Sequence, residues 1–319
     1  MIFLDFEKPI EELYQKLNKL KDLQAEGDIN LDDKIAEIDQ LILQKKEEVF
    51  SNLTPWQRVQ LSRHPERPYT LYYIHHIFES FIELHGDRKL EDDKAIVGGI
   101  AKLDGKSVMV IGHQKGVSTK MRQYRNFGMA SPSGYRKAMR LMRLAEKFEM
   151  PVVTFIDTPG AYAGIEAEDF GQAEAIARNL YEMSILRTPI ISYVIGEGAS
   201  GGAIGIGVAD KLMMLENTWF TVISPESCSS ILWRSWDYKE QAAEQLNLTA
   251  TDMTRLKIVD SIVKEPLGGA HRHKKEMSKL LKASIKRNIT TLSKIPMDDL
   301  IEKRINKYAS IGVFDEAKV

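Results

Sequence analysis

Two apolar segments, each followed by a glycine-containing loop, most constrain the fold of this chain. Residues 151–156 lead into a loop with Gly160, and residues 190–195 lead into a glycine-rich turn at residues 196–202. A helical pattern over residues 170–186 separates them. Strands joined through a helix run parallel, and the loops at their carboxyl ends lie side by side. The sequence therefore predicts an α/β core in which the two loops meet at one edge of a sheet.

Dinucleotide binding is one interpretation of the glycine turn. Residues 196–201 carry glycine at the first, third and sixth positions, and Glu216 stands where a ribose-binding acid would follow. Against this, the chain reaches Asp210 within a few residues of the turn, which is short for a crossover helix. The turn also belongs to a later strand of the core, whereas the fingerprint normally follows the first.

Ser200 supports an alternative interpretation, because a serine among glycines at a strand-to-helix turn is typical of the nucleophile of an acyl hydrolase. Asp260 and His271 follow in the order that such a triad requires. A serine in a tight turn needs no chemical role, however, and neither partner stands in a convincing sequence context.

A third interpretation needs no nucleophilic side chain. The N–H groups of Gly201 and Gly202 at a helix start, and those of Gly160 and Ala161 in the neighbouring loop, can converge on one oxygen. Backbone donors of this kind stabilise enolates and tetrahedral oxyanions, each contributing about 3 kcal/mol. Glycine suits the turn because a Cβ atom would obstruct the approach.

Residues 115–147 carry the one marked charge polarity of the chain. The whole sequence holds 44 Lys and Arg against 45 Asp and Glu, whereas this stretch holds nine basic residues and one acid, Glu146. Its first half is expected to be a loop and residues 135–148 an amphipathic helix. The stretch is either a solvated helix face or a site for phosphate or carboxylate groups. The candidate anion-binding residues are Lys115, Lys120, Arg125 and Arg136.

Four segments are expected along the chain. Residues 1–50 form an amphipathic helical hairpin, either a flap on its own domain or a contact arm for another subunit. Residues 51–94 are expected to be helical, with a helical run at residues 70–84. Residues 95–265 form the core, which begins with a β-hairpin around Asp104-Gly105, and residues 266–319 form a C-terminal helical region.

Composition excludes several classes of protein. The single cysteine, Cys228, allows no internal disulfide and no cysteine cluster for zinc. No apolar run approaches the roughly 20 residues that span a bilayer, and a net charge of −1 gives no general attraction to membranes or nucleic acids. His75 and His76 would point about 100° apart on a helix and cannot share a metal. A cytoplasmic protein is expected.

Motifs along nearly the whole chain resemble the alpha subunits of bacterial acetyl-CoA carboxylase carboxyltransferases. The resemblance implies an α/β, crotonase-like (ClpP/crotonase) fold of stacked ββα units. It also implies an α2β2 heterotetramer with a beta subunit. The residues that carry it are Leu4 to Pro9, Arg67 to Leu71, His85 to Arg88, Asp93 to Gly99, Arg125 to Met129, Gly134 to Ala138, Asp157 to Tyr162, the glycine turn, Ile223 to Glu226 and Glu265 to His271.

The resemblance also implies a reaction. The family transfers a carboxyl group from carboxybiotin on the biotin carboxyl carrier protein to acetyl-CoA, giving malonyl-CoA for fatty acid biosynthesis. It works with biotin carboxylase in a larger, ATP-dependent complex. Gly201 and Gly202 match the oxyanion hole that serves biotin, Gly160 and Ala161 are a candidate second wall, and Tyr162 is a candidate substrate contact. No cofactor is expected on this chain, and zinc is expected only on the beta subunit.

A few positions depart from the pattern of the family. Ala163 replaces a usual proline, Ala199 a frequent glycine within the turn, and Ser227 a usual glycine. None of these changes removes a backbone donor of the expected oxyanion hole.

Overall fold

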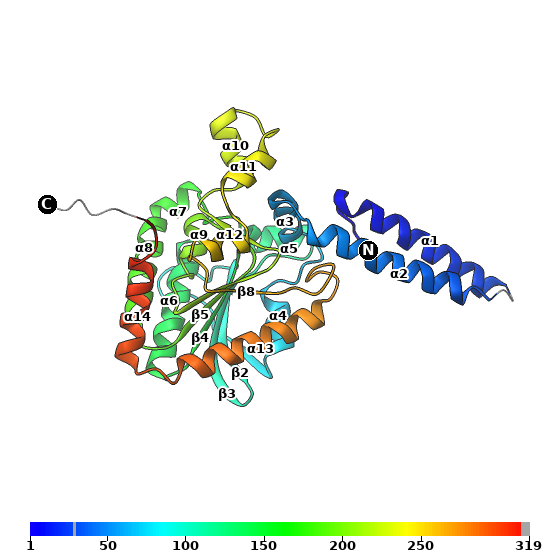
Figure 1. Cartoon of the computed structure of the whole chain (residues 1–319). Coiled ribbons are helices and arrows are strands. Elements are labelled where there is room, and N and C mark those ends of the chain that lie inside the picture. Colours follow the sequence, from blue (N-terminus) through cyan, green and yellow to red (C-terminus); the bar gives the residue numbers. More distant parts are fainter. Residues whose placement is uncertain (28–29, 314–319) are drawn as a thin grey trace.

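A mixed eight-stranded sheet forms the centre of the molecule in a computed structural model that describes residues 1–27 and 30–313 (Figure 1). Its order is β1-β2-β3-β4-β5-β6-β8, and β7 pairs with the end of β5. The strands are β1 (Ser80–Glu83), β2 (Ile96–Leu103), β3 (Lys106–His113), β4 (Val152–Thr158), β5 (Ile190–Ala199), β6 (Lys211–Leu215), β7 (Trp219–Thr221) and β8 (Ser261–Val263).

The predicted β-hairpin joins β2 to β3. Leu103 pairs with Lys106, and Asp104 and Gly105 between them adopt φ angles of 48° and 78°. From β3 through β4, β5 and β6 to β8 the strands are parallel. Every residue of β4 and β5 is buried, as their apolar sequences predict for strands covered on both faces.

Helices cover both faces of the sheet. On one face, Tyr135, Leu141 and Met142 of α6 pack against β2 and β4. On the other, Tyr73 of α4 and Leu281 of α13 pack beside β4 and β5. The covering helices are α4 (Thr70–Ile77), α6 (Pro132–Lys147), α7 (Ile165–Asp169), α8 (Gln172–Ile185), α9 (Ser200–Ile204), α12 (Ala250–Arg255), α13 (Lys274–Leu292) and α14 (Met297–Ala309).

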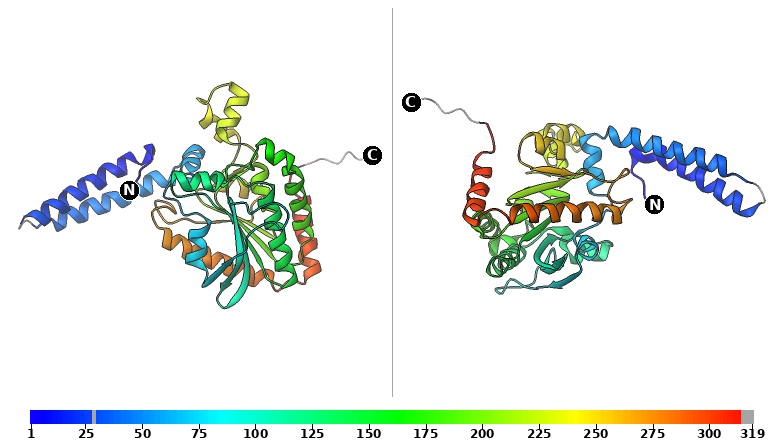
Figure 2. Two further views of the ribbon diagram at one scale, coloured as in Figure 1. Left: turned by 180° about the vertical axis from the view of Figure 1, so that it is seen from behind. Right: turned by 60° about the horizontal axis from the view of Figure 1, so that its bottom comes forward.

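The expected N-terminal hairpin is present and projects from the body on the side opposite α14 (Figures 1 and 2). It consists of a short 3₁₀ turn, η1 (Asp5–Glu7), followed by α1 (Lys8–Glu26) and α2 (Asp32–Ser51). Within these two long helices only Ile10, Leu17 and Ile42 are buried. The tip at residues 28–29 lies outside the described residues. Because so little of the hairpin is covered, its apolar stripe stays largely accessible to another chain.

The remaining helices lie near the carboxyl ends of the parallel strands. A compact pair, α10 and α11, rises above this edge of the sheet in Figure 1. Across the described residues, no helix is long and apolar enough to cross a membrane. These helices are α3 (Pro55–Ser62), α5 (Thr119–Tyr124), η2 (Asn126–Gly128), α10 (Pro225–Trp233) and α11 (Lys239–Gln245).

Two local predictions were wrong. The helical run expected over residues 70–84 ends at Ile77, and Ser80–Glu83 forms β1, which pairs antiparallel with β2. Segment 51–94 therefore contributes a strand to the sheet and is not purely helical. The stretch after Lys115 was expected to be a loop, but it contains α5, whose Ser118 caps the first turn by accepting from the Met121 amide.

Candidate functional site

The two glycine loops meet at the carboxyl edge of the sheet. β4 and β5 are parallel neighbours, and Thr158 at the end of β4 pairs with Gly198 in β5. The sequence predicted this adjacency from the order of strand, helix and strand. The loop after Thr158 and the start of α9 therefore face each other.

Gly202 packs directly on the peptide between Gly160 and Ala161. A Cβ atom on Gly202 would lie 2.6 Å from the carbonyl carbon of Gly160 and 2.7 Å from the amide nitrogen of Ala161. Both distances are shorter than any side chain tolerates, and the obstructing atoms belong to backbone. Only glycine allows the two loops this contact.

The backbone donors at the contact differ in availability. The N-cap of α9 is Ala199, which has no side chain that can accept from the first-turn amides of Gly201 and Gly202. Gly160 donates its own amide to Thr158 Oγ1 at 3.1 Å. The Ala161 amide has no protein acceptor among residues 1–27 and 30–313. Ala161, rather than Gly160, is therefore the available donor of the second loop.

Ser200 has the strained, exposed backbone position of a nucleophile elbow but lacks the acid and histidine partners of a catalytic triad. It is exposed at the start of α9 with φ of 56°, a left-handed conformation that is strained for serine. The proposed partners are engaged elsewhere: Asp260 bonds Lys211 and Lys307, and the buried His271 stacks on His64. The structure therefore does not assemble the triad of the hydrolase alternative.

The dinucleotide interpretation has no structural support either. The helix after the turn, α9, spans only Ser200–Ile204. Glu216 accepts from Lys264 and from the Glu265 amide, so it is part of an ion pair at the end of β6. It belongs to the packing of β6 against β8 and not to a ribose site.

A buried charge network lies beneath the glycine turn. Lys115, just beyond β3, places Nζ 2.7 Å from Asp157 Oδ1 and 2.5 Å from Glu197 Oε2. Arg63 at the end of α3 donates from Nε to Glu197 Oε1 at 2.6 Å and also pairs with Glu226. The Glu197 amide donates to Asp157 Oδ1 at 3.0 Å. The network thus ties the ends of three adjacent parallel strands to one another.

Burial and pairing shift the pKa values of this network in opposite directions. Burial raises the pKa of the Asp157 carboxyl more than the Lys115 charge lowers it. For Glu197 burial also acts to raise the pKa, but the charges of Lys115 and Arg63 prevail and lower it. Burial alone would lower the pKa of Lys115, and the two carboxylates raise it instead. Lys115 and Glu197 are therefore held as a charged pair.

The four basic candidates do not gather at one place. Lys115 lines a cavity of about 540 Å³ together with Arg63, Tyr69, Arg122 and Glu197. Its charge is already balanced by two carboxylates, which weakens the expectation that it steers anions.

The other three do not line that cavity, although Arg125, at the end of α5, lines a smaller one of about 260 Å³ together with Lys115. Lys120 is exposed on α5. Arg125 donates to the Lys94 carbonyl at 2.9 Å, and Arg136 pairs with Asp87 at 3.0 Å. Tyr162 lines a different cavity, of about 600 Å³, beside α5 and α7.

Sequence reasoning missed Glu197, Asp157 and Arg63 as members of the site. One signal was present: Glu197 is an acid between two glycines at the end of an otherwise apolar strand. A buried carboxylate requires a charged or hydrogen-bonding partner. Gly196 next to it is also required, because a Cβ there would collide with the Asp157 carboxylate.

One group of potential metal ligands occurs in the described part of the chain, formed by Glu7, His64 and His271. His64 already uses both ring nitrogens, accepting from the Glu66 amide at 3.1 Å and reaching the Ile2 carbonyl at 3.2 Å. Its Nε2 proton points at that carbonyl, so no lone pair is free for a cation. The group packs the N-terminal segment onto the body and does not suit a metal.

Comparison with known proteins identifies the family. The sequence profile described as acetyl co-enzyme A carboxylase carboxyltransferase-like matches residues 3–312. The acetyl-coenzyme A carboxylase carboxyl transferase subunit alpha of Flavobacterium johnsoniae is 56% identical over 317 residues, which cover 99% of this chain and all of that protein. The subunit of the same name from Chlorobaculum parvum is 55% identical, covering 99% of this chain and 98% of that protein. The chain belongs to the acetyl-CoA carboxylase carboxyltransferase alpha family.

Solved structures of low identity share the fold of this carboxyltransferase alpha chain. A transcarboxylase 12S structure aligns with a TM-score of 0.55 at 18% identity, covering 80% of this chain and 44% of that one. A chain of a Pseudomonas malonate decarboxylase hetero-tetramer in complex with coenzyme A aligns with a TM-score of 0.58 at 15% identity. The alignment covers 75% of this chain and 94% of that one. The expected α/β fold of the carboxyltransferase and crotonase type is confirmed.

Family membership confirms the function implied by the sequence motifs. The chain is a carboxyltransferase component of acetyl-CoA carboxylase. Ala199, which departs from the pattern of the family, is accommodated: it is buried at the N-cap with φ of −102°, an extended conformation open to any residue.

Proposed function

We propose that the alpha chain supplies one of two oxyanion holes, the one that stabilises the ureido oxygen of biotin during carboxyl transfer to acetyl-CoA. The contact of Gly202 with the Gly160–Ala161 peptide carries this proposal, because it packs the uncapped start of α9 against the loop that carries the Ala161 amide. Gly201, Gly202 and Ala161 are the donors, and Gly160 forms the wall behind them.

The proposed donors act on charge that appears only during the reaction. The bond between the biotin nitrogen and the carboxyl carbon breaks, and its electron pair moves into the ureido group, which becomes an anion. The methyl carbon of acetyl-CoA loses a proton and attacks the released carbon dioxide to form malonyl-CoA. That proton ends on the biotin nitrogen. Each backbone donor aimed at the ureido oxygen contributes about 3 kcal/mol, because fixed dipoles need no reorganisation.

The second oxyanion hole, for the thioester enolate, is assigned to the beta subunit of an α2β2 heterotetramer. Exposed apolar side chains at either end of α7 and at the end of α9, the helix that follows the glycine turn, form a surface for that subunit. An apolar patch of this kind beside a half-formed site is typical of a protein interface. Its members are Ile165, Phe170 and Ile204.

Other parts of the proposal follow the family. Carboxybiotin arrives on the biotin carboxyl carrier protein and is regenerated by biotin carboxylase. Zinc is assigned to the beta subunit, and the single cysteine here, Cys228, cannot form a cysteine cluster. We place the complex in the cytoplasm. The body of the chain, residues 95–265, is the catalytic core, and the hairpin of residues 1–50 is a subunit contact.

Reconstitution tests the proposal. The alpha chain, mixed with its beta partner, free biotin and malonyl-CoA, is expected to catalyse decarboxylation of malonyl-CoA through transient carboxylation of biotin. Either chain alone is expected to be inactive, because each contributes one oxyanion hole. Full turnover by the alpha chain alone would contradict the shared site.

A further inference from the structure

A basic pocket of about 340 Å³ lies between α6 and α8, apart from the glycine turn. It is bordered by the loop that follows β1. Six cationic side chains line it: Arg88, Lys89, Arg136, Arg140, Arg143 and Arg178. No residue that lines this pocket also lines the cavity that contains Lys115.

The carboxylates at the pocket balance only half of this charge. Asp87 pairs with Arg136 at 3.0 Å. Glu182 pairs with Arg143 and lies 3.5 Å from Arg178, which is also 3.7 Å from Glu174. The six cationic side chains and the three carboxylates of Asp87, Glu174 and Glu182 sum to a net charge of +3. The whole chain, by contrast, has a net charge of −1.

Arg88, Lys89 and Arg140 are the pocket cations without a carboxylate partner among the described residues. Arg140 donates to the carbonyl oxygens of Gly86 at 2.9 Å and His85 at 3.1 Å, and Arg88 donates to the His85 carbonyl at 2.7 Å. Burial lowers the pKa of Arg140, and the neighbouring Arg88 charge lowers it further. A bound anion would relieve this repulsion.

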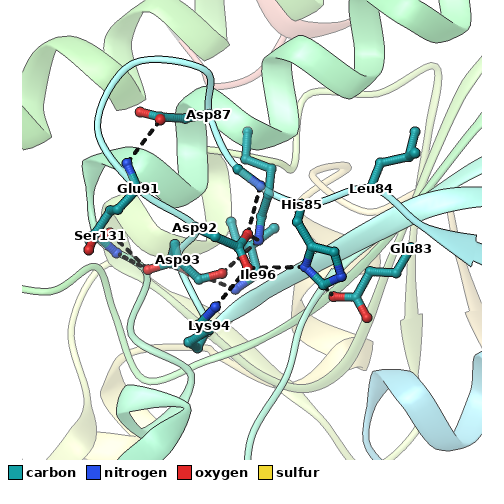
Figure 3. A network of polar contacts seen from close by, with 12 residues as sticks. Glu83, Leu84, His85, Asp87, Glu91, Asp92, Asp93, Lys94, Ile96 and Ser131 are labelled. Carbon is teal, nitrogen blue, oxygen red and sulfur yellow. Dashed lines mark hydrogen bonds and ion pairs between the residues drawn. The ribbon is translucent and has the colours of Figure 1, made fainter.

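The loop that carries Arg88 is held in place before any ligand arrives. Asp87 Oδ1 accepts from the amides of Lys89 at 2.9 Å and Leu90 at 2.8 Å. It also accepts from the Glu91 amide at 3.2 Å, as Figure 3 shows, and Asp92 accepts from the Gly86 amide at 2.8 Å. Arg88 itself has φ of 67°. A non-glycine residue in this left-handed conformation is strained, and such strain is concentrated at binding sites.

We propose that this pocket binds a diphosphate group. Planar guanidinium groups donate in pairs to phosphate oxygens, and clusters of arginine are typical of sites that recognise multiply charged phosphates. The pocket volume of about 340 Å³ lies at the small end of the range for ligand pockets. Two sources share this chemistry: the diphosphate of a coenzyme A thioester, and a free phosphorylated effector.

The pocket also has a physical connection to the glycine turn. Ile176 of α8 packs on Gly201, where a Cβ would lie 3.4 Å from Ile176 Cδ1, while Arg178 on the same helix lines the pocket. A ligand that fixes α8 therefore acts on the element that supports the start of α9.

Inorganic pyrophosphate titrated into the full chain at constant ionic strength tests the site by calorimetry. We expect saturable binding of one pyrophosphate per chain. Arg88→Gln and Arg140→Gln should each weaken it at least about tenfold, which corresponds to about 1.4 kcal/mol. Lys147→Gln is the matched control, because Lys147 is exposed on α6 and lies outside the pocket.

Arg88 is exposed, so its variant should keep the fold even if Arg140→Gln does not. No saturable binding, or equal weakening by Lys147→Gln, would overturn the proposal.

The reconstituted complex separates the two sources of the diphosphate. If the pocket holds the coenzyme A thioester, Arg88→Gln should raise the KM for malonyl-CoA severalfold and leave kcat nearly unchanged. If it holds a free effector, the KM should stay constant, while pyrophosphate changes the rate of the wild-type complex and not that of the variant. Both outcomes support the site, because each depends on the Arg88 side chain of the pocket.

Discussion

The ammonium group of Lys115 lies 2.7 Å from Oδ1 of Asp157, in an environment that exposes only 12% of the lysine side chain and 1% of the aspartate. Lys115 follows β3, and Asp157 belongs to β4. The same nitrogen reaches Glu197 in β5, so one cation joins the ends of three strands. The positions of both glycine loops therefore depend on a charge pair that never needs to touch the substrate.

Replacing Lys115 with methionine is expected to reduce the free energy of unfolding by about 3–5 kcal/mol, because the buried Asp157 would lose its paired cation and Glu197 would keep only Arg63. Urea denaturation of the full chain measures the change. Lys120→Met is the control, since Lys120 is exposed and its loss should cost less than about 0.5 kcal/mol. A loss below about 1 kcal/mol for Lys115→Met would mean that the network relaxes by protonation.

Gly202→Val is expected to abolish carboxyl transfer in the reconstituted complex. The added Cβ would collide with the Gly160–Ala161 peptide and separate the amides from the two loops. Ser200→Ala is the matched variant two residues away, and it should keep most of the activity, because only backbone N–H groups are assigned to the reaction. Decarboxylation of malonyl-CoA in the presence of biotin measures both.

A correctly folded Ser200→Ala chain without any turnover would revive the hydrolase alternative. Far-ultraviolet circular dichroism of both variants distinguishes loss of chemistry from loss of fold.

The parts of the fold that the sequence predicted rest on strong local patterns. β4 and β5 are continuous apolar runs bounded by Gly and Pro, and Asp104-Gly105 specifies a tight turn between two strands. The contact between the two glycine loops then follows from chain order alone.

The parts that it missed depend on pairing between distant residues. Residues 80–83 continue the helical pattern of α4, but their backbone groups pair with β2, and that tertiary contact overrides local preference. Arg304 shows the same limit in a side chain. It is one of many basic residues near the C-terminus, yet it is buried with both oxygens of Asp210 at 2.8 Å. No local feature distinguishes it from exposed neighbours.

Mild acid is expected to destabilise the chain through three buried histidines. Burial lowers the pKa of His64 to about 4, of His113 to about 3 and of His271 to about 2. The positive charge of Lys115 lowers the pKa of His113 further. The positive charge of Arg272 does the same for His64 and His271. From pH 6.5 down to about 4, the unfolded chain binds protons that the folded chain does not. The free energy of unfolding should therefore fall with pH, by up to about 1.4 kcal/mol per pH unit for each histidine.

Urea denaturation at pH 7, 6 and 5 measures this slope. His271→Gln should reduce it, whereas His75→Gln should not, because His75 is exposed. An unfolding free energy that is constant from pH 7 to 5 would show that the buried imidazoles accept protons without cost.

The hairpin of α1 and α2 is expected to support assembly rather than folding. Leu23, Leu41 and Leu43 on its long helices are between 43% and 57% exposed, which places apolar surface where the body of the chain does not cover it. Replacing all three with glutamate should weaken association with the beta subunit or with the second alpha chain, because burying a charged side chain at an interface is costly. Light scattering after size exclusion of the mixed subunits measures the assembled mass.

The same triple variant should unfold in urea at nearly the wild-type concentration, since the leucines contribute little to the core of the monomer. Glutamate in place of the exposed Leu90, which lies on the body, is the control for added charge. If the triple variant assembles fully but unfolds earlier, the hairpin is a flap that stabilises its own chain, and the contact-arm proposal fails.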